Sequence, residues 1–149
     1  MSALQHRLRP VESQPDAFPA ARLVVNVVCT SERETSAAIQ AAGVLARNLD
    51  AVVRIVSFLI VPYPLDLDQP CVSPAFTAAR WASLARGLDM EVQCQICYCR
   101  EIAAAVEETL SPNSLVVVGR RAGWWSRRGT RLVRLLRSQH HKIVVVDVR

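Results

Sequence analysis

The chain has 149 residues, and 51% of them are hydrophobic, which suits one folded domain with a sizeable core and argues against a disordered chain. Its formal net charge of +5 is unevenly placed, because residues 120–142 hold eight arginines or lysines and no acidic residue. The remaining chain has 10 basic and 13 acidic groups, so an anionic partner would be attracted to this one segment.

No stretch of the sequence predicts a membrane span or a secretory leader. The longest apolar run, residues 55–65, is interrupted by Pro62 and Pro64 and is shorter than the roughly 20 residues that a span needs. The first twenty residues contain three prolines and no apolar leader core. We therefore expect a flexible N-terminal tail at residues 1–20, a folded domain at residues 21–149, and a cytoplasmic protein.

Strands and helices are expected to alternate from residue 22 onward. The apolar run at residues 22–29 predicts a strand, and Ser31 and Glu34 then have the spacing of a capping box at the start of a helix over residues 32–48. Ser73 and Pro74 mark another helix start, because proline is tolerated in the first turn. The further expected strands are residues 52–61, 91–99, 114–119 and 142–148, and the further expected helices are residues 100–110 and 130–139.

This alternation predicts an α/β fold. Helices long enough to serve as crossovers imply parallel strands, and a parallel sheet is covered on both faces. We expect a doubly wound, Rossmann-like, five-stranded parallel sheet with helices on both faces. Such sheets bind ligands beyond the carboxyl ends of the strands where the winding reverses, here between the first and fourth expected strands. Cys29, Thr30 and Ser31 end or follow the first of these strands, and Gly119 ends the fourth.

The segment "GRRAGWWSRRGTRLVRLLR", residues 119–137, predicts an anion site. Gly119 and Gly123 allow the backbone to approach a ligand closely and to present its N–H groups. Gly129 and Thr130 stand at the expected start of the fourth helix, where free N–H groups favour phosphate. Arg120 and Arg121 would add guanidinium donors for the same anion.

These residues carry a resemblance to a known family. "VVVG" (116–119) is similar to the end of the fourth strand of universal stress protein domains, "GT" (129–130) to the Gly-Ser or Gly-Thr step of their nucleotide-binding branch, and "HHKIVVV" (140–146) to their last strand. The resemblance covers about residues 22–148. It implies a fold like that of adenine nucleotide alpha hydrolases, and ATP or another adenine nucleotide as the ligand of the glycine loop.

Two departures from the family pattern predict a degenerate site. The nucleotide-binding branch has glycines separated by two and then nine residues, whereas this chain has three residues between Gly119 and Gly123 and five between Gly123 and Gly129. The aspartate that usually ends the first strand corresponds to Cys29. The resemblance and the fold together place the nucleotide or anion contacts at Cys29, Thr30, Ser31, Gly119, Arg120, Arg121, Gly123, Gly129 and Thr130.

The last expected strand predicts a contact between two copies of the chain. At the expected edge of the sheet, "KIVVVDV" (142–148) would present unpaired backbone groups unless something covers it. The resembling family commonly dimerises through its last strand. We expect a homodimer whose interface contains Ile143, Val144, Val145, Val146 and Val148.

Other interpretations of the basic segment stay open. Arginines at positions 127, 131, 134 and 137 are typical of a solvated helix face. Arginines beside Trp124 and Trp125 also suit single-stranded nucleic acid or an anionic membrane surface. We disfavour nucleic acid as the partner, because the sequence contains no nucleic-acid-binding motif. The two tryptophans could instead close the crevice, which leaves a module of the same fold that binds an acidic protein and no nucleotide.

No residue pattern indicates catalysis or a metal site, so we expect a non-catalytic module. His140 and His141 precede the last strand, away from the crevice, and His6 lies in the expected tail. Cys94 should point to the opposite face of its strand from Cys97 and Cys99, so these three cysteines cannot close a tetrahedral site. We expect free, mostly buried thiols, with a redox role for Cys97 and Cys99 as the alternative.

Overall fold

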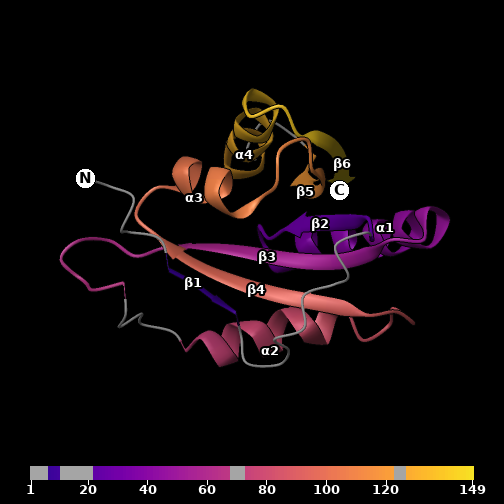
Figure 1. The fold of residues 1–149 in the computed structure, drawn as a ribbon, viewed down its shortest axis with the longest axis horizontal. Coiled ribbons are helices and arrows are strands. Elements are labelled where there is room, and N and C mark those ends of the chain that lie inside the picture. Colours follow the sequence, from indigo (N-terminus) through magenta and orange to yellow (C-terminus); the bar gives the residue numbers. More distant parts are fainter. Residues whose placement is uncertain (1–6, 11–21, 68–72, 123–126) are drawn as a thin grey trace.

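The computed structural model describes residues 7–10, 22–67, 73–122 and 127–149 (Figure 1). In chain order its elements are β1 (Arg7–Pro10), β2 (Val24–Val28), α1 (Glu32–Leu49), β3 (Val52–Ile60), α2 (Pro74–Leu84), β4 (Val92–Cys99), α3 (Ile102–Thr109), β5 (Leu115–Arg121), α4 (Arg127–Ser138) and β6 (Lys142–Val148). The predictions made for Gly123, Trp124 and Trp125 fall outside the described residues.

The strands form one sheet in the order β1-β4-β3-β2-β5-β6. Five of them, β2 to β6, pair in parallel, and the chain winds outward from β2 in both directions. The predicted doubly wound, five-stranded parallel sheet is confirmed, with its reversal between β2 and β5 as expected. Within the segment expected to be a tail, residues 7–10 form a sixth strand, β1, which runs antiparallel to β4 and pairs Arg7 with Tyr98.

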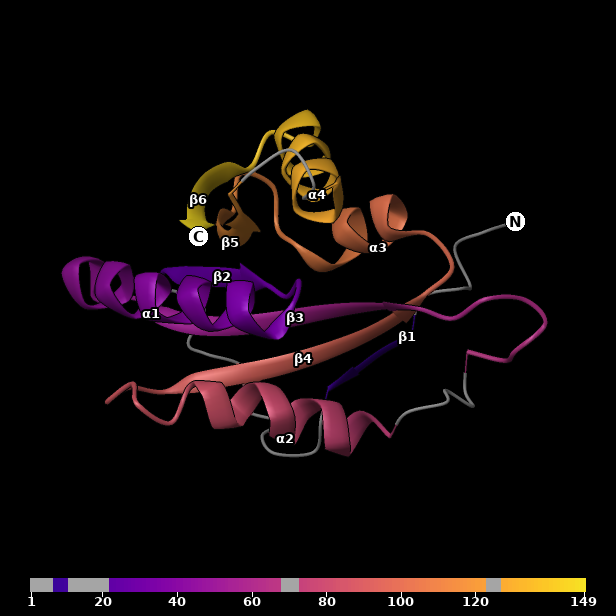
Figure 2. The ribbon, with the colours of Figure 1, turned by 180° about the vertical axis from the view of Figure 1, so that it is seen from behind.

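Two pairs of helices cover the two faces of the sheet (Figures 1 and 2). On one face, Val25, Val27 and Ile55 pack against alanines of α1 and against Trp81 of α2. The facing residues of α1 are small because Ala38 and Ala42 let the helix lie close to the strands. On the other face, α3 and α4 bury Val106, Leu132, Val133 and Leu136 against the alternate strand residues, among them Val56, Val116 and Val118.

β6 lies at the edge of the sheet, where its side chains are only partly covered. Val144 and Val146 pack toward the α1 and α2 layer, and Ile143 and Val145 toward the α3 and α4 layer. All four remain half-buried, as does Val148. Since only β5 pairs with β6 among the described strands, the predicted edge position of the last strand is confirmed.

α1 and α4 both end in a left-handed residue that is not glycine. After α4, His140 has φ of 64°, its N–H donates to Arg137 O at 3.0 Å, and His141 N–H donates to Leu136 O at 3.2 Å. This is the hydrogen-bond pattern of a Schellman motif, in which the left-handed position normally takes glycine. Asp50 takes the same left-handed position after α1, with φ of 49°, and its N–H also donates to carbonyl groups of the last helical turn.

Glycine should therefore stabilise the end of α4. We expect His140→Gly to raise the free energy of unfolding by about 1 kcal/mol, because a side chain disfavours left-handed backbone by roughly that amount. Urea denaturation of both proteins measures the difference. Ser138→Gly, at the last residue of the helix, should instead lower stability by about 1 kcal/mol. A gain in stability in both variants would contradict the assignment of His140 as the left-handed cap.

His141 is a buried imidazole that accepts a hydrogen bond. Its side chain is 9% exposed, and Ser114 N–H donates to its Nδ1 at 3.2 Å, which joins the start of β5 to the turn before β6. Burial, followed by repulsion from His140, lowers the pKa of His141 below its ordinary value. The folded protein therefore holds this imidazole in its neutral form more strongly than the unfolded chain does.

This imidazole should make stability depend on pH. Because the folded pKa of His141 is lowered, the unfolded chain binds the proton more readily. The stabilising contribution of the neutral imidazole is therefore complete above about pH 6.5, the unfolded pKa, and is lost as the pH falls from there through the lower folded pKa. We expect His141→Asn, whose amide oxygen can accept the same bond, to show a shallower loss of stability between pH 8 and pH 5 than the wild type. Equal pH slopes in thermal denaturation would contradict this account.

Candidate functional site

A cavity of about 400 Å³ opens at the carboxyl edge of the sheet, on the face covered by α3 and α4. Its walls come from the ends of β2 and β3, from the start of α3 and from the first turns of α4. The lining residues are Val28, Cys29, Thr30, Phe58, Ile60, Ile102, Arg127, Arg128, Arg131, Leu132 and Leu135. Its size lies within the usual range for pockets that bind small molecules.

The cavity has an apolar side and a cationic side. Phe58 and Ile60 of β3, Ile102 of α3 and the leucines of α4 supply the apolar surface, whereas Arg127, Arg128 and Arg131 supply three guanidinium groups. Neither aspartate nor glutamate occurs among the lining residues. The arrangement suits a ligand with a flat or apolar body and an anionic end, because arginine binds phosphate and carboxylate through paired N–H groups.

Cys29 is among the lining residues, and its neutral thiol packs in the α1 and α2 layer. Burial, followed by the proximity of Cys94, raises the pKa of Cys29 well above its ordinary value. Its own backbone N–H continues the pairing with β3 by donating to Val56 O at 2.9 Å. Cys29 can therefore contact a ligand by packing, but it brings neither the negative charge nor the acceptor strength of an aspartate.

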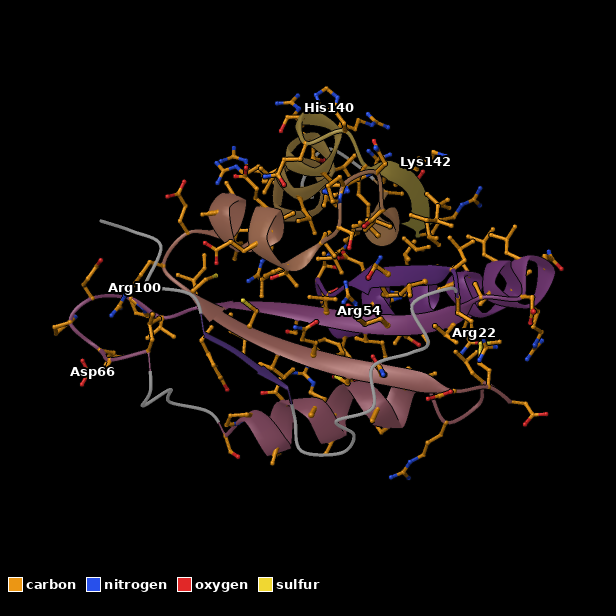
Figure 3. All side chains as sticks on the ribbon, in the orientation of Figure 1. Arg22, Arg54, Asp66, Arg100, His140 and Lys142 are labelled. Carbon is orange, nitrogen blue, oxygen red and sulfur yellow. The ribbon has the colours of Figure 1, made fainter. Side chains whose placement is uncertain are left out.

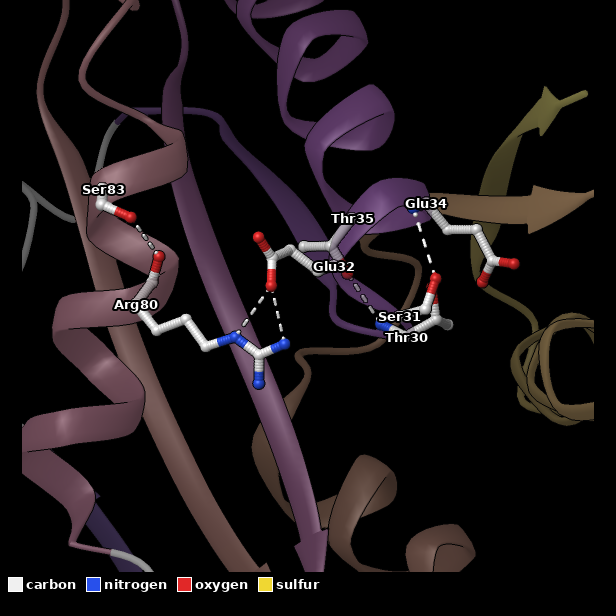
Figure 4. Close-up of polar contacts among 7 residues, drawn as sticks. All are labelled: Thr30, Ser31, Glu32, Glu34, Thr35, Arg80 and Ser83. Carbon is white, nitrogen blue, oxygen red and sulfur yellow. Dashed lines mark hydrogen bonds and ion pairs between the residues drawn. The ribbon is translucent and has the colours of Figure 1, made fainter.

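Contacts of Thr30 and Ser31 fix the start of α1 (Figure 4). Thr30 N–H donates to Thr35 Oγ1 at 2.9 Å, and Thr30 Oγ1 donates to Gly119 O at 3.3 Å. Ser31 is the N-cap, and its Oγ accepts from Glu34 N–H at 3.4 Å, as the capping spacing predicts. Thr30 lines the cavity, whereas Ser31 is absent from the lining.

Gly119 is needed for packing between β5 and α1. A Cβ added at this position would lie 2.0 Å from Glu34 O and 2.5 Å from Glu34 C, both backbone atoms. The first turn of α1 therefore occupies the space that a side chain would take. Gly119 permits a close approach of backbone, as expected for a glycine after a strand, but its neighbour is the helix of the same chain.

The other residues predicted on the glycine segment lie apart from the cavity lining. Arg120 Nε donates to Asp147 Oδ1 of β6 at 3.0 Å, and Arg121 is exposed at the end of β5. Since α4 includes Arg127, Gly129 and Thr130 lie within its first turn rather than at the expected start at residue 130. Gly129 is buried and Thr130 is half-buried.

The structure thus brings together a set of residues that only partly overlaps the prediction. Cys29 and Thr30 line the cavity as expected, and Arg127, Arg128 and Arg131 replace Arg120 and Arg121 as the nearest cations. The sequence pattern assigned Arg127 and Arg131 to a solvated helix face, and both residues are indeed exposed. The sequence analysis did not include the end of β3 in the site. Phe58 and Ile60 could have been included, because they stand at the carboxyl end of a parallel strand, where ligands of such sheets bind.

Arg100 fixes the loop that follows β3, next to Ile60 of the cavity. Its Nη1 donates to Val61 O at 2.7 Å and its Nη2 to Leu65 O at 2.5 Å. The guanidinium also lies over the Tyr63 ring, 4.1 Å from the ring centre. Figure 3 shows Arg100 in the same part of the molecule as Asp66 of this loop. One side chain after β4 therefore determines the path of the chain after β3.

A second arginine joins the two helices of the opposite layer. Arg80 of α2 holds Glu32 in the first turn of α1, with Nη2 to Oε2 at 2.8 Å (Figure 4). The same guanidinium lies over Trp81 at 5.1 Å from the ring centre. Both charged partners are largely exposed, so the pair orients the helices more than it stabilises them.

The cysteines occupy both sides of the sheet, as the strand period predicts. Cys94 packs in the α1 and α2 layer, and Cys97 and Cys99 pack in the α3 and α4 layer. Burial raises the pKa of Cys94 to about 11 and that of Cys99 to about 12. These thiols are protonated at neutral pH, and no group of metal-ligating side chains is found in the part of the chain that the structure describes.

Comparison with solved structures identifies the fold. A universal stress protein from Archaeoglobus fulgidus superposes with a TM-score of 0.61 over 83% of this chain and 93% of its own, at 14% sequence identity. The chain has the universal stress protein fold. The universal stress protein from Archaeoglobus fulgidus in complex with dAMP gives a TM-score of 0.58 at 14% identity, covering 84% of this chain and 97% of that one.

A third structure with the universal stress protein fold, a complex with cAMP, gives a TM-score of 0.56 at 12% identity and covers 85% of this chain and 98% of its own. No family model and no curated protein matches the sequence. The similarity to these proteins therefore lies in the backbone fold and not in the sequence. None of the helices in the described part of the chain is long and apolar enough to cross a bilayer.

Proposed function

We propose that this chain is a non-catalytic binding module of the universal stress protein fold, with a degenerate site for an adenine nucleotide or a related anion at the carboxyl edge of its sheet. The single observation that carries the proposal is that three arginines of α4 line the same cavity as the apolar ends of β2 and β3. An adenine ring would pack against Phe58 and Ile60. Its phosphate would be held by Arg127, Arg128 and Arg131.

The solved structures of the same fold support this choice of ligand. Two of them are complexes with adenine nucleotides, one with dAMP and one with cAMP. Both ligands carry a single phosphate, which matches a cavity of about 400 Å³ better than a long polyphosphate would. We accordingly propose a nucleoside monophosphate ahead of ATP as the preferred adenine nucleotide.

The site is degenerate in two respects. Cys29 stands at the end of β2, where the resembling nucleotide-binding branch has an aspartate, and burial keeps its thiol neutral. The segment after Gly119 is shortened, and Gly119 already contacts the backbone of α1. We therefore expect weak binding that depends on the arginines, and no turnover of the bound nucleotide.

We also propose a homodimer formed through β6 and a cytoplasmic location. The half-buried side chains of Ile143 to Val146 and the open backbone edge of β6 support the dimer. Four described cysteines are free, which suits a reducing compartment. Sedimentation across micromolar concentrations tests the dimer, and a monomer throughout would contradict it.

Thermal denaturation of the full chain in the presence of AMP, ADP, ATP and sulfate tests the ligand. We expect saturable stabilisation by AMP that exceeds the effect of sulfate and persists at moderate salt, since a ligand of the native state stabilises it by RT ln(1 + [L]/Kd). Equal stabilisation by every anion, lost with added salt, would contradict a specific site. Nucleotide analysis after incubation should show no hydrolysis.

One observation favours a second function, the binding of an acidic partner. Five arginines of α4 are exposed, and the helix contains no acidic residue. This face suits an acidic protein, whereas the absence of a nucleic-acid motif from the sequence makes nucleic acid a weaker choice. Failure of every nucleotide to stabilise the chain would favour the protein partner.

A further inference from the structure

A second cavity, of about 340 Å³, lies at the opposite, amino edge of the sheet. It is lined by Arg22, Leu23, Val24, Asn26, Arg54, Ser111, Pro112, Asn113, Ser114 and Leu115. These residues come from the starts of β2 and β5, from β3 and from the loop after α3. Figure 3 shows Arg22 and Arg54 well away from Arg100 and Asp66, which lie toward the carboxyl edge.

Two polar residues in central strands build the floor of this cavity. Asn26 of β2 and Arg54 of β3 are register partners, and the residues paired on either side of them, 24–28 and 52–56, are otherwise valine and isoleucine. Asn26 is only 2% exposed. Its Oδ1 accepts from Arg54 Nε at 2.9 Å, and its Nδ2 donates to Leu115 O at 3.3 Å. Both ends of the amide are thus engaged, and its bond to Leu115 O fixes the oxygen that holds the guanidinium.

Arg54 is a half-buried cation that lacks a carboxylate among the described residues. No ion pair joins it to any aspartate or glutamate in the described part of the chain. Burial lowers its pKa from the ordinary value, yet an arginine stays charged at any physiological pH. A charge that is partly removed from water and has no carboxylate partner among the described residues is stabilised by an anion, so this arrangement favours one.

We infer that Arg54, oriented by Asn26, and Arg22 at the rim form a carboxylate-binding site at the amino edge of the sheet. Asn26 occupies the Nε–H of Arg54 and leaves its two terminal nitrogens for a ligand. These nitrogens form a planar fork that matches the two oxygens of one carboxylate. Arg22, whose side chain is 43% exposed, lies 3.9 Å from the fully exposed Asp50 carboxylate and would exchange this loose partner for the second carboxylate of a small dicarboxylate.

The carboxylate can come from two sources, which the experiment separates. One is a free dicarboxylate, and the other is the chain itself, since residues 11–21 join β1 to β2 and contain Glu12 and Asp16. Succinate is the probe, and thermal denaturation and calorimetric titration of the full chain are the measurements. Wild type and a Glu12→Gln, Asp16→Asn double variant are compared.

If the ligand is free, succinate should stabilise the wild type saturably, with binding weakened about tenfold or more by Arg54→Lys, which loses the fork, and severalfold by Arg22→Met. If the carboxylate belongs to the chain, the double variant should be less stable than the wild type and succinate should restore it. Both results support the site. Absence of any succinate response in both proteins would overturn it.

Two matched variants guard against a merely structural effect. Asn26→Asp places a carboxylate beside Arg54 and loses the donor to Leu115 O, so it should fold with lower stability and abolish the succinate response. Arg86→Met removes an exposed arginine that does not line the cavity and should leave the response unchanged. An equal loss of succinate affinity in Arg86→Met and Arg54→Lys would overturn the inference.

This site is independent of the one proposed at the carboxyl edge. Replacement of Arg127 and Arg131 should weaken nucleotide binding and leave succinate binding intact. Arg54→Lys should weaken succinate binding and leave nucleotide binding intact. Each site can therefore fail without the other.

Discussion

Substitution of Gly119 by alanine should lower the free energy of unfolding by about 3 kcal/mol or more, at the upper end of the usual cost of overpacking. The added methyl group would stand 2.0 Å from Glu34 O. That oxygen belongs to the first turn of α1, whose backbone is fixed by the Ser31 cap and by the contact of Thr30 with Thr35. The helix as a whole would have to move away from β5.

Urea denaturation of Gly119→Ala and wild type measures this cost. Gly87→Ala is the matched control, because a Cβ at Gly87 would meet nothing within 4 Å and its backbone is not left-handed. We expect the control to change stability by less than about 0.5 kcal/mol, as is usual for surface positions. Equal effects in the two variants would contradict the packing role of Gly119. A domain with the usual stability of about 5–15 kcal/mol would remain folded in either case.

Reversal of charge at Arg127 and Arg131 together should weaken binding of AMP by about 100-fold or more. Each charge-assisted hydrogen bond contributes about 1.5–3 kcal/mol, and each 1.4 kcal/mol corresponds to a factor of ten in affinity. Both arginines line the carboxyl-edge cavity, and the new glutamates would repel the phosphate. Calorimetric titration of AMP into Arg127→Glu, Arg131→Glu measures the change.

Arg134→Glu, Arg137→Glu is the matched control. It makes the same change in net charge on the same helix, at two exposed residues that do not line the cavity. Salt screens charges farther than about 10 Å apart, so binding should weaken by only about threefold. An equal loss in both double variants would indicate a general basic surface and would favour the acidic protein partner.

The sheet could be predicted from the sequence because burial on both faces leaves continuous apolar runs in parallel strands. The runs at β2, β3, β5 and β6 are nearly all valine, isoleucine and leucine, and the capping residue Ser31 marks the start of α1. β1 could not be predicted in this way. Its four residues, "RLRP", contain a single aliphatic side chain, and its partner β4 is remote in the sequence.

The candidate site was only partly predictable. Cys29 and Thr30 follow from the rule that ligands bind beyond the carboxyl ends of strands, and the rule applies equally to Phe58 and Ile60, which were missed. The roles of Gly119 and Arg120 depended on contacts with α1 and β6 that no local pattern reveals. The position of Arg128 depended on the extra turn at the start of α4.

The pair of Asn26 and Arg54 also bears on how the chain selects one alignment of its strands. Valine-rich strands are nearly interchangeable along their length, so a shift of two residues would bury almost the same side chains. Such a shift would separate Asn26 from Arg54 and from Leu115 O, leaving a buried guanidinium and a buried amide without their hydrogen bonds. Three central strands, β2, β3 and β5, are thereby locked into a single mutual alignment by one amide side chain.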